Sequence, residues 1–152
     1  MIRADTMPAR RTDRSSANVE LVRSIYARWG GGDFSFTDWA RPDIEFEIVG
    51  GPDPGSWTGL AGMLRGWRQW LAAWDSYAAA ADEFRELDGE RVLVLGRMSG
   101  RGKASGVNVE TEFANVLHIR DDAIAELRLY SSRERAFTDL GLTREGDLAD
   151  SP

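Results

Sequence analysis

The second half of the chain alternates strand-forming stretches with short turns, and this feature most limits the folds open to it. Four strands are predicted, at residues 77–87, 91–100, 107–120 and 123–131. The segments between them, LDGE, GRGKASG and RDD, are short enough to be hairpin turns. Strands joined in this way pair with their neighbours, so we expect an antiparallel meander.

Helical patterns are confined to the chain ahead of this meander and to one short stretch after it. Residues 16–29 carry apolar side chains at helical spacing, with Ser16 placed to cap the start and glycines following Trp29. A second helix is predicted from the apolar stripe Leu60, Leu64, Trp67, Leu71 and Trp74. A final short helix, SRERAFTDL, is expected to stop at Gly141. Helices first and strands after indicate an α+β fold, with a curved, mainly antiparallel sheet wrapped around the N-terminal helices.

The length of 152 residues is that of one ordinary domain. We expect a disordered leader at 1–15, a folded domain at 16–142 and a flexible tail at 143–152. The leader contains an arginine cluster but has neither helical periodicity nor the apolar run of a signal peptide. We interpret it as a solvated tail.

Composition excludes several classes of function. The chain has no cysteine and one histidine, which excludes disulfides and thiolate chemistry and disfavours a metal site; we expect neither a metal nor a cofactor. A net charge of -6 disfavours nucleic acid as a partner. No segment approaches the roughly 20 apolar residues that cross a bilayer. We therefore expect a cytoplasmic location and no membrane partner.

Several stretches together resemble a known family. The segments LVRSIYARWGGGD, PDIEFEIVGG, WTGLAGM, VLVLGRMSGRGKASG and LRLYSSRERAFTDLGL, in this order, are similar to the SnoaL-like branch of the nuclear transport factor two-like superfamily. The resemblance covers about residues 16–142. It implies a cystatin-like cone with an apolar pocket for a small hydrophobic molecule. Members include ketosteroid isomerases, polyketide cyclases and proteins without catalysis, so fold alone does not choose the function.

The pleat of one late strand decides which polar group faces the inside of such a cone. In FANVLHI, Asn115 shares a face with Leu117 and other apolar residues, whereas His118 lies on the opposite face. We therefore expect Asn115 and Leu117 inside and His118 on the convex face, in a structural or interface role. In DIEFEIV, Phe46 and Ile48 are expected inside because they alternate with glutamates, and together with Leu117 they are candidate ligand contacts.

The resemblance to ketosteroid isomerase implies two catalytic candidates. Asn115 occupies the position of that enzyme's neutral carboxylic acid, which donates a hydrogen bond to the developing enolate. Tyr26 lies within one residue of the position of its tyrosine donor. Together they predict a partial oxyanion site. The alternatives are a core aromatic for Tyr26 and a water-holding amide for Asn115. A general base is missing: Glu47, the acid nearest the required position, is expected to face outward, because burying it alone would cost several kcal/mol.

Three further residues are candidate ligand contacts. Arg97 is placed like the arginine of limonene-epoxide hydrolases, but Ser99 and Leu129 stand near the positions of that enzyme's two acids, so its hydrolytic chemistry is disfavoured. An inward Arg97 would suit an anionic ligand oxygen, with Ser99 beside it. The alternative is a salt bridge to a neighbouring strand or exposure at the mouth of the cavity. Trp57, expected in a loop, is placed to close the cavity as a lid.

The strand at 91–100 is apolar on both faces, so we expect a homodimer formed through the convex face of the sheet. The leading hypothesis is a pocket for a polycyclic or aromatic compound, with isomerase- or cyclase-type acid–base chemistry implied by the resemblance. The alternative is a non-catalytic binding or interaction module. The sequence leaves open whether the protein is an enzyme.

Overall fold

The structure is a computed structural model that describes residues 6–31, 33, 37–50 and 54–142, with side chains from residue 17 onward. Over these residues the chain forms three helices and six strands. In order they are α1 (Thr6–Gly30), β1 (Ala40–Val49), β2 (Gly55–Thr58), α2 (Gly59–Ala72), β3 (Trp74–Glu86), β4 (Arg91–Gly102), β5 (Asn108–Arg120), β6 (Ala123–Tyr130) and α3 (Arg133–Leu140). The predicted α+β class is confirmed.

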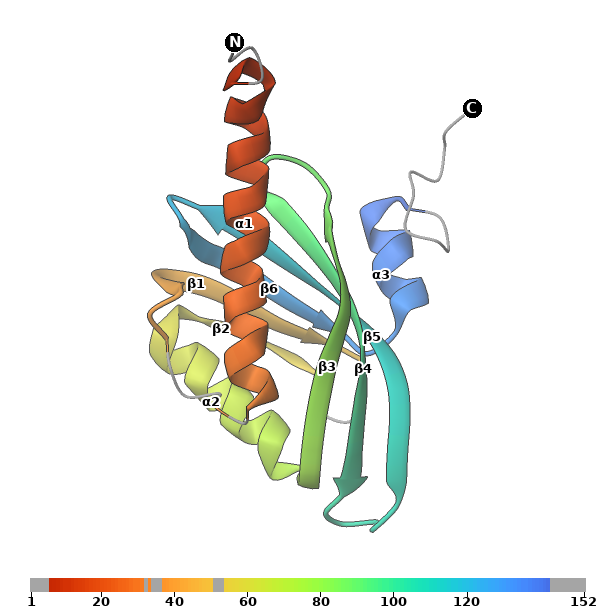
Figure 1. Cartoon of the computed structure of the whole chain (residues 1–152). Helices are drawn as coiled ribbons and strands as arrows, with labels where there is room; N and C mark the ends of the chain where they lie inside the picture. Colours follow the sequence, from red (N-terminus) through yellow and green to blue (C-terminus); the bar gives the residue numbers. More distant parts are fainter. Residues whose placement is uncertain (1–5, 32, 34–36, 51–53, 143–152) are drawn as a thin grey trace.

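All six strands belong to one open, curved sheet, in the order β2-β1-β6-β5-β4-β3 (Figure 1). Strands β3 to β6 pair antiparallel in sequence order, which confirms the predicted meander and its four strands. The β5–β6 hairpin turns at Asp121 and Asp122, which both have positive φ, as a tight two-residue turn requires. Only the pairing of β1 with β6 is parallel, so the sheet is mixed.

Strand β4 contains a glycine, Gly96, next to a bulge in its pairing with β3. A side chain at Gly96 would clash with the Ala80 carbonyl of β3 and with the ring of Phe113 on β5. The register of β3 against β4 also shifts between Ala81 and Glu83, which marks a bulge. A bulge beside a glycine is a means of curving a sheet, because both allow the backbones to bend together.

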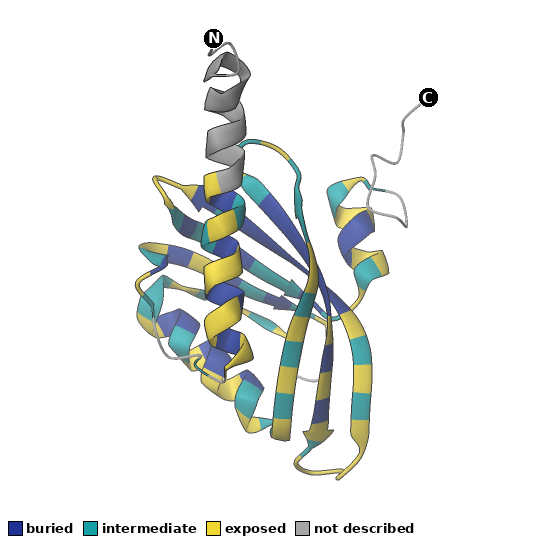
Figure 2. Cartoon of the chain, viewed as in Figure 1, coloured by how far each residue is buried: buried dark blue, intermediate teal, exposed yellow. Residues whose placement is uncertain are grey.

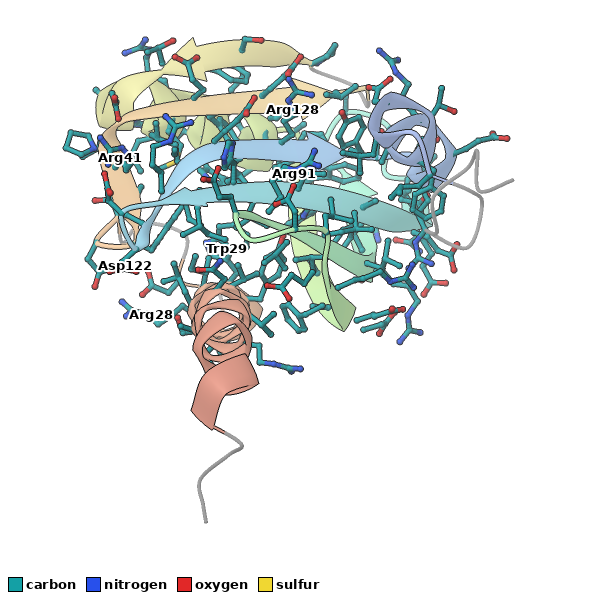
Figure 3. All side chains as sticks on the ribbon, turned by 90° about the horizontal axis from the view of Figure 1, so that it is seen from above. Arg28, Trp29, Arg41, Arg91, Asp122 and Arg128 are labelled. Carbon is teal, nitrogen blue, oxygen red and sulfur yellow. The ribbon has the colours of Figure 1, made fainter. Side chains whose placement is uncertain are left out.

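The helices lie on opposite faces of the sheet. Helices α1 and α2 cover the concave face, and their exposed residues follow the side turned away from it (Figure 2). The main core lies between them, built from β-sheet residues such as Ile44 and Leu117 and from α1 residues such as Trp29, which points toward the sheet (Figure 3). The start of β3, the end of β4 and the start of β5 extend beyond the C-terminal end of α1 (Figure 1).

Helix α3 packs on the convex face and forms a second cluster with it. Ala136 and Phe137 of α3 bury Leu93 and Leu95 of β4, together with their neighbours on β5 and β6. Ser132 caps the helix by accepting a hydrogen bond from the Arg135 amide, and Gly141 ends it in the left-handed conformation, as predicted. The apolar convex side of β4 is thus covered within one chain. The homodimer stays a prediction, but this reason for it no longer holds.

Two local predictions are wrong and a third is right only in part. Helix α1 begins at Thr6 and not at Ser16, so the helix continues through the arginine-rich stretch ahead of Ser16. Trp67 of the predicted α2 stripe is buried, and Leu60 and Leu71 are partly buried against the core, but the fully buried face also contains Gly62, Met63, Gly66 and Trp70. Trp74, predicted in this helix, begins β3 instead. The glycines let α2 approach closely: at Gly66 a side chain would meet the rings of Trp57 and Phe46. The predicted tail, 143–152, lies outside the described residues.

Candidate functional site

A buried pair of polar side chains lies at the centre of the concave face. Asn115 of β5 donates a hydrogen bond from Nδ2 to the hydroxyl oxygen of Tyr26 on α1, at 2.6 Å. The two residues are 7% and 8% exposed. The amide is inward as predicted, and it meets the predicted tyrosine. The pair is arranged in series: Asn115 donates to Tyr26, and the tyrosine proton is left to donate to a further acceptor.

Burial sets the protonation state of the two tyrosines in this region. Desolvation raises the pKa of Tyr26 far above its ordinary value; the hydrogen bond from Asn115 opposes the rise, and nearby Tyr77 adds to it. Desolvation also raises the pKa of Tyr77, with the indole of Trp70 beside it opposing the rise. Both hydroxyls therefore remain neutral donors at physiological pH. A neutral donor polarised by a second donor is suited to an oxygen that carries or gains negative charge.

The pair opens into a small inner pocket of about 30 Å³. Its walls are largely aromatic: besides Tyr26 and Asn115, they include Trp29, Ile48, Trp67, Trp70, Tyr77, Ala79, Met98, Phe113, Leu129, Tyr130 and Ser131. The rings are packed against one another, for example Tyr26 and Trp29 at 4.7 Å between ring centroids. This volume accommodates one or two water molecules and not a ring compound.

A second and larger hollow, of about 840 Å³, lies around the edge strand β3. Its inner part is a groove between α1 and β3, lined by Arg23, Tyr26, Ala27, Gly30, Ala79, Ala81, Phe84, Met98 and Thr111. Its outer part lies on the convex face. The four consecutive alanines at 78–81 explain this form, because their short side chains leave both faces of β3 low. The alanine run is therefore the feature of the sequence that could have predicted the groove. The alternation that predicts strand β3 does not by itself indicate a groove.

Arg97 and Ser99 do not face the inner pocket, so the expected inward direction is wrong. Both line the outer part of the hollow on the convex face. The Arg97 side chain is 68% exposed and forms a two-pronged ion pair with Asp82 on β3, at 3.0 and 3.1 Å. The alternative, a salt bridge to a neighbouring strand, is confirmed. The cause is register: Asn115 pairs with Val94, which puts the even-numbered residues of β4 inside.

The other predicted ligand contacts lie on the concave face, but only Ile48 lines the inner pocket. Phe46 and Leu117 are fully packed in the core behind it. Trp57 is in strand β2 and not in a loop; its ring packs on Phe46 at 5.6 Å between centroids and fills the space left by Gly66. It is therefore a wedge between β2 and α2, and it does not line either hollow.

The candidate acids and the histidine lie outside the pocket. His118 is on the convex face as predicted, with Nε2 at 2.8 Å from Glu90 and Nδ1 at 4.0 Å from Glu126. Glu45 accepts a hydrogen bond from Thr58, and Glu47 lies 3.4 Å from Arg128. Among the described residues lining the inner pocket, none is an acid or a histidine. Within the described chain, no three acidic or histidine side chains converge as metal ligands.

Solved structures of low sequence identity define the class of fold. A nuclear transport factor two-like protein from Burkholderia thailandensis superposes with a TM-score of 0.69, at 21% identity over 80% of this chain and 95% of its own. TerC, co-crystallised with polyporic acid, gives 0.67 at 22% identity over 82% and 97%. A putative SnoaL-like polyketide cyclase from Jannaschia sp. CCS1 gives 0.65 at 15% identity over 90% and 94%. The fold is thus the cystatin-like cone of this superfamily.

Within that class, the SnoaL-like domain family matches residues 22–127, and the chain belongs to this family. The match begins in α1, a few residues before Tyr26, and ends in β6 after Asn115, so it contains both members of the buried pair. No curated protein matches the chain in sequence. No helix among the described residues is long and apolar enough to span a membrane.

Proposed function

We propose that the protein binds a small, mainly apolar ring compound through an acceptor oxygen that reaches the Tyr26 hydroxyl. The observation that carries this proposal is the buried 2.6 Å hydrogen bond from Asn115 to Tyr26 in the wall of a largely aromatic pocket. A buried hydroxyl normally uses its proton in a hydrogen bond. A phenol, enol or carbonyl oxygen of a ligand supplies such an acceptor, and the aromatic walls suit the rings.

The proposal places the body of the ligand in the groove between α1 and β3, because the inner pocket is too small for it. Ligand sites are commonly about 300–1,000 Å³, whereas the inner pocket holds about 30 Å³. The groove shares Tyr26 with that pocket, so a ring lying along the alanines of β3 has its leading edge near the tyrosine. Arg23 lies at the rim, over the ring of Phe84 at 4.7 Å, and suits a ligand with an acidic substituent.

Catalysis of the isomerase or cyclase type would use Tyr26 as the donor to an enolate oxygen. Such a reaction also needs a base at the carbon that loses its proton. The described residues of the inner pocket supply none. The neighbour described as a putative polyketide cyclase supports this chemistry, but the side chains favour binding. Ligand binding is therefore the proposed function, and acid–base chemistry through an enol is the second candidate.

A binding experiment with 2-naphthol, a flat ring compound with one hydroxyl, tests the proposal. Tyr26→Phe and Asn115→Ala should each weaken binding by about three- to tenfold, the effect of losing one neutral hydrogen bond. Asn18→Ala is the matched control: Asn18 is the other buried asparagine, 6% exposed, and donates to the Gly89 carbonyl away from the pocket. If Asn18→Ala weakens binding as much as the other two, or if none of the three changes it, the proposed site is wrong.

A further inference from the structure

The groove and the inner pocket are neighbouring spaces with a shared wall. Three described residues line both: Tyr26, Ala79 and Met98. Anything that passes from the groove to the Asn115–Tyr26 pair must therefore pass these side chains. The two spaces are separate in this structure, and Met98, 5% exposed, is buried in the wall between them.

Met98 is the long side chain in a row of shorter ones. On the sheet it pairs with Ala79 of β3 and with Thr111 of β5. Its neighbours on the same face of β4 are Gly96 and Gly100, which carry no side chain at all. Rings from other strands occupy the space above these glycines, with Phe113 over Gly96 and Trp74 over Gly100. Met98 thus lies between two glycine positions whose overlying space is filled by aromatic rings, and all three side chains belong to the same core cluster.

The three shared residues differ in freedom to move. Tyr26 is held by the hydrogen bond from Asn115 and packs edge-on against Trp29 and Phe84. Ala79 has only a methyl group. Met98 is unbranched, has three rotatable bonds and makes favourable sulfur contacts with aromatic rings in more than one arrangement. Of the wall residues, it is the one whose rotation changes the size of the opening.

We infer that Met98 is a movable partition between the groove and the inner pocket, and that it determines how far a flat ring reaches toward Tyr26. The ligand part of this inference rests on the proposed function. When Met98 turns aside, groove and pocket become one elongated space that ends at the tyrosine hydroxyl. Its sulfur then lies against the face or edge of the ligand ring, where the same contact is favourable. The protein is accordingly selective for flat aromatic rings over bulkier saturated ones.

The absence of cysteine from the chain gives a direct test of the partition. Ile48→Cys places one thiol in the inner pocket, because Ile48 lines that pocket and not the groove. Its rate of reaction with methyl methanethiosulfonate measures access to the pocket. Adding Met98→Ala should raise this rate by about tenfold or more, because local opening is no longer needed. Adding Met98→Leu, which conserves volume but is stiffer, should not raise it.

Met63→Ala in the same cysteine background is the matched control. Met63 is also fully buried, but it lies in α2 and does not line either space. A general loosening of the core raises the rate in both alanine variants, whereas loss of the partition raises it only for Met98→Ala. Equal rates in the two variants, or no increase for Met98→Ala, would overturn the inference whatever the protein binds.

Binding of 2-naphthol separates this inference from the proposed function. With the partition removed, Met98→Ala should bind 2-naphthol about fivefold or more tightly than the natural chain, because no side chain has to be displaced. Tyr26→Phe added to Met98→Ala should cancel most of this gain. If the higher affinity of Met98→Ala is retained after Tyr26→Phe, the tyrosine is rejected as the ligand contact, but the inference that Met98 is a partition stands. An affinity unchanged by Met98→Ala, with the thiol equally protected, rejects the partition but keeps the proposed function.

Discussion

Gly96→Ala should be among the most damaging single-methyl changes in this protein. The added Cβ would lie 2.8 Å from Cε2 of Phe113 and closer still to the Ala80 carbonyl of the next strand. Real Cβ atoms do not approach so closely, so something must move. The carbonyl belongs to a strand held by β-ladder pairing, and Phe113 is 5% exposed, so neither can yield without disturbing the sheet or the core.

Overpacking of this kind costs typically 1–3 kcal/mol, and we expect the upper end, about 3 kcal/mol, because one obstacle is backbone. For a domain of this size that corresponds to a fall in Tm of about 6–12 °C. Urea unfolding followed by tryptophan fluorescence measures the change. Gly89→Ala is the control, since nothing lies within 4 Å of its added methyl group and its φ is not positive; it should change stability by less than about 1 kcal/mol. A loss below about 1 kcal/mol for Gly96→Ala would refute the account of the bend.

Three smaller changes test other parts of the fold. Ser132→Ala removes the side-chain cap of α3 and should cost about 1 kcal/mol in urea unfolding, or about 3 °C in Tm; no change would mean that the cap does not stabilise α3. Asp122→Gly relieves a positive φ of 64° in the β5–β6 turn and should raise stability by about 0.5 kcal/mol in the same assay. Finally, because burial raises the pKa of Tyr26, the folded state favours its neutral form; this stability is complete below the unfolded pKa of about 10 and is lost as pH rises above it. Urea midpoints should therefore fall above about pH 10, and less steeply in Tyr26→Phe.

The elements whose pattern has one clear period could be predicted well. The four meander strands, the hairpins and the Gly141 stop follow from alternation and turn residues. The same alternation placed Asn115 inside and His118 outside, because the inner face of β5 is more apolar than the outer one at that point. These predictions need only local information.

Predictions failed where the pattern of apolar residues is compatible with two different buried faces. Strand β4 is apolar on both sides, so hydrophobicity does not say which face is inside, and the pairing of Asn115 with Val94 decides it against Arg97 and Ser99. Helix α2 has apolar residues on more than one side, and its glycines, which allow close approach, select the face that is buried. The volume of the inner pocket depends on how tryptophan rings fill the space above glycines, which no linear pattern contains.

Strand β3 offers a consequence of another kind. Along its alanine run, Ala79 and Ala81 border the groove, whereas Ala78 and Ala80 lie on the opposite side of the same backbone. A single layer of peptide units thus separates the groove from the outer surface of the sheet. Enlarging an odd-numbered alanine reshapes the groove, and enlarging an even-numbered one changes the outer surface, so selection or design is free to adjust the two independently.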